Sequence, residues 1–321
     1  MPLPAPFDRL RLPLIGSPLF IVSGPELVIA QCKAGIIGSF PALNARPQEQ
    51  LHQWISRIED GLATHRQARP QATVAPYGVN LIVHPSNARW QGDLAICAER
   101  RVPFIVTSLH APDEVVRRMQ PHGGVVFHDV TNVKHAKRAL AAGVDGLILV
   151  AAGAGGHAGQ LNPIALVNEI RAFYDGPLVL SGCISHGKDI LAAQALGCDY
   201  AYMGTRFIAT EESLASDGYR EMVLQSQAAD VVYTPYFSGV PANYLSESVR
   251  AAGLDPALLP ASGPAASPNL DSTSRAKAWK DIWSAGQGVG SAQELLSVEM
   301  LVEQLEQEYL HAREALLARA A

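Results

Sequence analysis

The chain alternates short apolar runs with stretches in which apolar residues recur at helical spacing. The segment from Pro47 to Arg66 shows the helical pattern, since Leu51, Ile55 and Ile58 fall on one side of a helix. The predicted strands cover residues 12–15, 34–40, 77–83, 103–108, 124–129, 147–152, 178–182 and 199–205. The predicted helices cover residues 25–33, 47–66, 88–101, 112–120, 132–142, 163–174 and 187–196, and one more begins near residue 211.

The predicted strands are almost continuously apolar, which is typical of a parallel sheet covered by helices on its outer face. Eight parallel strands close into a barrel, so we predict an α/β fold, a (β/α)8 TIM barrel with residues 1–225 as its core. An open doubly wound sheet would need a Gly-x-Gly-x-x-Gly turn after its first strand. The turn at Gly16, Ser17 and Pro18 does not provide one.

The strand and helix pattern stops after residue 225. Residues 231–270 are rich in proline, glycine, serine and alanine, so we predict an irregular excursion, small subdomain or lid over residues 226–275. Helical patterning returns at 274–283, breaks at 284–290 and resumes at 292–320. Residues 276–321 are therefore expected to form a C-terminal helical segment that returns to the barrel.

The composition and net charge of the chain indicate which kind of binding partner to expect. The 321 residues are 48% hydrophobic and 17% charged, which suits a globular protein with a large core. A net charge of −5 and the absence of a long basic run argue against nucleic acid and anionic membranes, so a small molecule is the expected partner. Neither a leader peptide nor a membrane-spanning segment is evident, and we expect a cytoplasmic protein. The sequence does not indicate an oligomeric state.

The most distinctive stretch is residues 147–159, where an apolar run leads into four glycines and His157. A flexible turn with an incidental histidine and a ligand cradle are both consistent with this stretch alone. Since active sites of such barrels lie at the carboxyl ends of the strands, its place after the sixth strand favours the cradle. His157, the only titratable group of the loop, is then the candidate acid, base or hydrogen-bond donor.

Two further strand ends indicate phosphate binding. In this fold the loops after the seventh and eighth strands commonly hold phosphate, and Ser181-Gly182 and Gly204-Thr205 stand there. The alternative is that both glycines only permit tight turns. Asn80 ends the third strand and is able to face a heteroaromatic ring edge, although a turn or cap asparagine fits equally well.

The remaining polar residues near the strand ends are interpreted as structural and not as catalytic or metal-binding. Asp129 follows His128 and is expected to cap the next helix. The four cysteines lie far apart, and Cys183 is taken as a small side chain of its loop. No metal site is expected, because His186 has no partner at ligand spacing.

Five segments in order, 77–81, 154–159, 181–182, 203–207 and 285–288, resemble the nitronate monooxygenases, formerly called 2-nitropropane dioxygenases. The resemblance implies a barrel that binds FMN without a covalent bond, with His157 as the catalytic residue. The cofactor-binding residues that it implies are Ser17, Pro18, Leu19, Asn80, Gly155, Gly156, Ser181, Gly182, Cys183, Met203, Gly204, Thr205, Gly286 and Gln287.

The resemblance also implies a reaction, in which a nitronate or nitroalkane and O2 give a carbonyl compound and nitrite. His157 would hydrogen-bond the nitro group and remove the α-proton of neutral nitroalkanes. Three alternatives stay open: a flavin-dependent enoyl-thioester reductase, an NADH:quinone reductase, and a non-catalytic FMN-binding barrel or assembly component. Reduction of the flavin by NAD(P)H is also left open.

The chain departs from the family pattern around the expected flavin. It has Ser17-Pro18-Leu19 for Gly-Gly-Met, Asp129 for lysine, Val150 for glutamine and Cys183 for glycine. Loss of a cation at position 129 is expected to change the redox potential or the substrate class, because a cation stabilises a reduced, anionic flavin.

Overall fold

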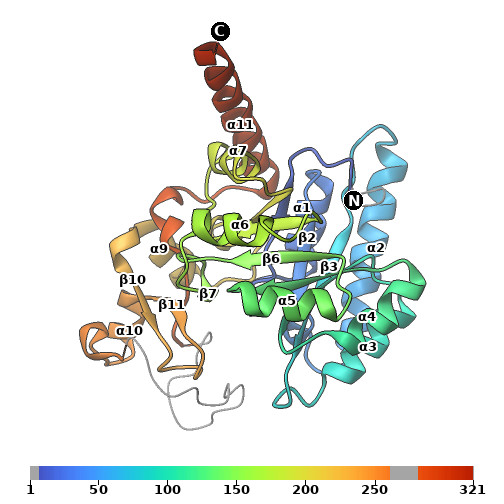
Figure 1. Cartoon of the computed structure of the whole chain (residues 1–321), viewed down its shortest axis with the longest axis horizontal. Coiled ribbons are helices and arrows are strands. Elements are labelled where there is room, and N and C mark those ends of the chain that lie inside the picture. The colour runs from blue at the N-terminus through green and yellow to red at the C-terminus, as the bar shows by residue number, and fades with distance from the viewer. Residues whose placement is uncertain (1–6, 261–280, 321) are drawn as a thin grey trace.

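A computed structural model describes residues 7–260 and 281–320 and contains the predicted barrel (Figure 1). Its eight parallel strands lie in the order β1-β9-β8-β6-β5-β4-β3-β2. A bridge between Ile15 and Ile37 joins β1 to the chain beside β2 and closes the barrel. The barrel strands are β1 (Leu14–Gly16), β2 (Gly38–Pro41), β3 (Tyr77–Val83), β4 (Phe104–Leu109), β5 (Val125–Val130), β6 (Gly146–Val150), β8 (Leu178–Ser181) and β9 (Tyr200–Met203).

Helices follow the strands as the sequence predicts, and local signals set several of their ends. Asn132 and Asn162 cap α5 and α6 by accepting hydrogen bonds from backbone N–H groups of the first turn, and Pro163 opens α6. The helices around the barrel are α1 (Pro25–Lys33), α2 (Gln50–Ala68), α3 (Trp90–Glu99), α4 (Asp113–Met119), α5 (Val133–Ala141), α6 (Pro163–Arg171) and α7 (Gly187–Ala195).

The region after β9 differs from its prediction. In place of one helix from near residue 211, the chain forms the short α8 (Thr205–Ile208) directly at the strand end and α9 (Asp217–Gln225) later. Ser216 caps α9, because its hydroxyl accepts from the backbone N–H of Tyr219. Single 3-10 turns occur at Ala42–Asn44, Gln120–His122, Ala228–Asp230, Pro256–Leu258 and Gln287–Ser291.

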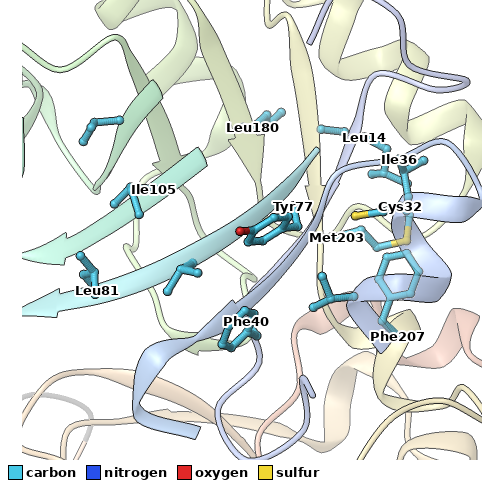
Figure 2. Close-up of a cluster of buried hydrophobic side chains, with 14 of the residues drawn as sticks. Leu14, Cys32, Ile36, Phe40, Tyr77, Leu81, Ile105, Leu180, Met203 and Phe207 are labelled. Carbon is cyan, nitrogen blue, oxygen red and sulfur yellow. The ribbon is translucent and has the colours of Figure 1, made fainter. Parts of the chain in front are cut away.

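The barrel strands bury both of their faces, which explains their continuous apolar sequence. On β5, Val125 and Phe127 point into the barrel, while Val126 and Val130 belong to the layer between barrel and helices. Figure 2 shows part of this outer layer, including Leu14. The same alternation directs Asp129, two residues beyond Phe127, toward the upper end of the barrel interior.

A second sheet stands beside the barrel mouth and was not predicted. β10 (Val231–Thr234) and β11 (Ala242–Leu245) form an antiparallel hairpin, and β11 also pairs with β7 (Gly156–His157). The hairpin, with α10 (Ser246–Ala251), lies on the opposite side of the molecule from α2, α3 and α4 (Figure 1). Within the predicted excursion, β10, β11 and α10 thus form regular structure, and β11 pairs with the loop that carries His157.

The chain ends in α11 (Val298–Ala320), which extends beyond the barrel (Figure 1). It begins six residues later than predicted, because Leu296 forms a bridge with Thr210 in an extended conformation. Leu301 and Leu305 are buried on the barrel side of this helix. The predicted helix at 274–283 lies mostly outside the described residues, and residues 281–283 are not helical.

Ile148 on β6 is fully buried in the barrel interior, so truncating its side chain should destabilise the protein strongly. Ile148→Ala should lower the free energy of unfolding by about 2–5 kcal/mol, measured by urea denaturation. The matched control is Ile164→Ala on α6, whose side chain is 54% exposed and should change stability by at most about 0.5 kcal/mol. Equal effects of both substitutions would contradict the described packing.

Candidate active site

A cavity of about 730 Å³ opens at the carboxyl ends of the barrel strands. Its volume lies in the usual range for small-molecule sites. Of the residues predicted to contact the cofactor or act in catalysis, the lining includes Ser17, Pro18, Leu19, Asn80, Gly155, Gly156, His157, Ser181, Gly182, Cys183, Gly204, Thr205 and Gly286. Met203 instead lies fully buried in the outer core, and Gln287 is not part of the lining.

The loop after β6 needs its glycines because other backbone segments approach it closely. Gly153 has φ 82°, and a Cβ there would collide with the Cys183 sulfur. A Cβ on Gly155 would lie 2.9 Å from the backbone nitrogen of Gly286. The segment at 286–287 holds this loop, since the backbone N–H of Gln287 donates to Gly153 O at 2.9 Å. Gln287 therefore positions the cavity wall through its backbone.

His157 lies in β7, opposite Ala242 of β11, and so belongs to the second sheet. Its Nε2 atom is 3.0 Å from Ser238 Oγ, and the Ser238 hydroxyl in turn lies 2.9 Å from the carbonyl of Val240. Burial lowers the pKa of His157 to about 4. The imidazole is therefore neutral near pH 7, the form that accepts a proton.

Two polar residues outside the predicted set fix the backbone around His157. Ser284 Oγ accepts from the N–H of Gly156 at 2.7 Å and donates to the carbonyl of Asn243 at 2.5 Å. Asn243 Nδ2 donates to the carbonyl of Ala154 at 2.7 Å. Sequence reasoning missed Ser238, Asn243 and Ser284 in these roles, because no local pattern links them to a loop more than eighty residues away.

A chain of polar side chains crosses the cavity floor on three neighbouring strands. Asn80 Nδ2 donates to Ser108 Oγ at 2.9 Å, and Ser108 Oγ donates to Asp129 Oδ2 at 2.7 Å. Burial raises the pKa of Asp129 to about 7. Asp129 therefore faces the cavity and does not cap α5, which corrects the prediction; Asn132 caps that helix.

His128 takes no part in this floor. It is buried and its Nδ1 atom is 2.8 Å from Thr107 Oγ1, in the outer layer of the sheet. Burial lowers the pKa of His128 to about 4. The adjacent His128 and Asp129 thus occupy opposite faces of β5, as strand alternation requires.

The two loops predicted to hold phosphate follow the adjacent strands β8 and β9. Gly182 has φ 126° and a Cβ there would lie 2.8 Å from Ala152 O, so the loop after β8 requires glycine. Cys183 takes a left-handed conformation with φ 57° and is exposed. Thr205 Oγ1 accepts from the N–H of Gly286 at 2.9 Å, which ties the loop after β9 to the segment at 286–287.

Across residues 7–260 and 281–320, no group of three or more histidine, cysteine, aspartate or glutamate side chains is placed to hold a metal ion. In the same part of the chain, no helix has the length and apolar character needed to cross a membrane.

A barrel that has a cavity at the carboxyl ends of its strands, with a half-buried histidine in the cavity lining, has the usual form of an enzyme active site. The family model described as nitronate monooxygenase matches residues 84–308, and the chain belongs to the nitronate monooxygenase family. It is 28% identical to a nitronate monooxygenase of Paraburkholderia phytofirmans, over 95% of this chain and 94% of that protein. The chain is accordingly an oxidoreductase.

Other relatives cover more than one activity. A carboxyl-CoA dehydrogenase of Rhodococcus jostii is 27% identical over 73% of this chain and 62% of its own length. The structure of nitroalkane oxidase from Streptomyces ansochromogenes matches with a TM-score of 0.79 at 26% identity, over 96% of this chain and 99% of that one. FabK from Thermotoga maritima shares the fold, with a TM-score of 0.75 at 23% identity over 98% and 97% of the two chains.

The burial of His157 predicts an imidazole that stays neutral from about pH 5 upward, because desolvation disfavours its charged form. Titration of protein with ¹⁵N-labelled histidine, followed by NMR, measures this pKa. His157→Asn identifies the signal by its disappearance. A midpoint at or above the ordinary value of about 6.5 would contradict the described environment.

Proposed function

We propose that the protein is an FMN-dependent nitronate monooxygenase that converts alkyl nitronates and O2 to carbonyl compounds and nitrite. The observation that carries this proposal is the half-buried imidazole of His157 on the wall of a cavity whose floor presents polar side chains from β3, β4 and β5. Family membership and the nitroalkane oxidase structure support the same substrate class.

The cavity residues fit a flavin nucleotide. Asp129 Oδ1 and the Tyr202 hydroxyl are enclosed on the cavity wall and have no hydrogen-bond partner among the described residues, as expected of atoms that contact a ligand. The loops at Gly182 and Gly204 would hold the phosphate, and Asn80 would face the ring. When bound, FMN supplies the electron transfer, and the protein supplies position and electrostatics.

His157 has two tasks in this proposal. It hydrogen-bonds the nitro group, and it accepts the α-proton of a neutral nitroalkane on its imidazole. Ser238, at 3.0 Å from Nε2, orients the ring. The sheet formed by β7, β10 and β11 contributes His157 and Tyr233 to the cavity lining and would exclude water from that side of the site.

The proposal keeps the predicted division of the chain. Residues 1–225 are the FMN-binding barrel, 226–275 an irregular excursion or lid, and 276–321 the segment that returns to the flavin site. The remaining partners are a small nitronate or nitroalkane, which would reduce the flavin in this proposal, and O2. The cytoplasm is the proposed location.

Purified protein reconstituted with FMN should be yellow and should consume O2 and release nitrite with propyl-2-nitronate or propionate 3-nitronate. Absorbance spectroscopy and a nitrite assay measure both outcomes. Protein that stays colourless after incubation with FMN and shows no turnover would sink the proposal.

His157→Asn should lower kcat/KM for neutral nitroalkane by about 10²–10⁴-fold, the usual contribution of a positioned general base. The loss on the already ionised nitronate should be smaller, because that substrate has no α-proton to remove. His122→Asn, at an exposed position, is the matched control and should change neither activity. Equal losses on both substrates would assign His157 to binding instead of proton abstraction.

A second candidate is a flavin-dependent thioester reductase, favoured by the relative that is named a carboxyl-CoA dehydrogenase. Anaerobic stopped-flow spectra distinguish the two activities. Fast bleaching of the flavin by NADH or NADPH, with slow response to nitronates, would replace the monooxygenase with a reductase.

A further inference from the structure

Two ionisable side chains, Asp129 and Tyr202, line the cavity in addition to His157. Asp129, at the end of β5, and Tyr202, on β9, both line the cavity, and Tyr202 is only 7% exposed. Asp129 Oδ1 and the Tyr202 hydroxyl are shielded atoms without a hydrogen-bond partner in the part of the chain that the structure describes. Buried polar atoms are almost always paired, so two such atoms on one cavity wall indicate a ligand that completes them.

The hydrogen bonds of the floor determine what Asp129 presents to that ligand. Asn80 Nδ2 donates to Ser108 Oγ, so the Ser108 hydroxyl directs its single hydrogen to Asp129 Oδ2. Oδ2 is thereby satisfied, and Oδ1 is the oxygen left for the ligand. A proton on Oδ1 would make it a donor, and the Tyr202 hydroxyl is a second donor.

The surroundings of Asp129 favour its neutral form. Ser108, Asn80 and Tyr202, from β4, β3 and β9, carry no charge near neutral pH, and Val150 of β6 is apolar. Within the described residues, no lysine or arginine lines the cavity. Desolvation raises the pKa of Asp129 to about 7 and is opposed only by the bond from Ser108.

The remaining ionisable groups of the lining do not supply a compensating cation. His135 lies near the same wall, and burial, with Lys134 and Arg138 as further causes, lowers its pKa. The pKa of Tyr202 is raised well above its ordinary value by desolvation and by Asp129. While Asp129 is protonated, a negative charge on a ligand at the cavity floor therefore lies next to neutral hydrogen-bond donors. Once Asp129 is ionised, the same charge lies next to a carboxylate, which repels it.

We propose that Asp129 and Tyr202 are a pair of uncharged hydrogen-bond donors that hold the acceptor-rich edge of the flavin ring. They make the affinity of the protein for reduced FMN dependent on pH. This inference rests on the proposed function, because the ligand is FMN. Protonated Asp129 donates to the ring, whereas the carboxylate repels the negative charge that reduction places there. The preference of the protein for reduced over oxidised FMN should therefore fall as pH rises.

The test is the ratio of the dissociation constants of oxidised and reduced FMN, obtained from midpoint potentials of bound and free FMN with dithionite as the reductant. In the natural protein this preference for reduced FMN should fall about tenfold between about pH 6 and about pH 8.5. Asp129→Asn keeps an N–H donor and cannot ionise, so its preference should fall by less than about threefold. Tyr202→Phe should weaken the preference at both pH values.

Asp113→Asn is the matched control, since it removes an exposed carboxylate on α4, and it should retain the pH dependence of the natural protein. Circular dichroism and FMN titration of each variant confirm that it is folded and binds. If Asp129→Asn shows the same change with pH as the natural protein, the inference is overturned while the proposed function stands. If the natural protein does not bind FMN, both fail.

Discussion

The hydroxyl of Ser284 joins the parts of the molecule on which the site depends. It accepts from Gly156 on β7 and donates to Asn243 on β11, so one atom connects the glycine-rich loop, the second sheet and the C-terminal segment. The Tyr219 hydroxyl lies 2.5 Å from the carbonyl of Ser284 and anchors that segment to α9. The loop has little apolar area of its own to bury, so these hydrogen bonds give His157 a fixed position.

This arrangement explains why the site is built from distant segments. The barrel provides a rigid floor from strand ends, while the sheet of β7, β10 and β11 provides the wall that carries His157. The floor contains ionisable Asp129, whose pKa is raised by burial, and the wall contains His157, whose pKa is lowered by burial. Two ionisable groups of one cavity thus have pKa values moved in opposite directions, which is typical of sites that move protons.

The barrel was predictable from sequence because each of its strands is a buried apolar run with a strong local signal. The candidate site followed from it, since Asn80, His157, Gly182 and Gly204 stand where those runs end. The strands β7, β10 and β11 were not predictable, because they lie in glycine- and proline-rich segments and form through pairing with one another. Asp129 was assigned to a cap, because sequence alone does not say that Asn132 performs that task.

A crystal structure of the protein with FMN tests the central claim most directly, because it locates the ligand relative to named atoms. The account predicts the phosphate at the loops of Gly182 and Gly204, with the ring between the Asn80, Ser108 and Asp129 floor and His157. An FMN-saturated crystal in which this cavity holds no flavin, or in which the ring is remote from His157, would contradict it.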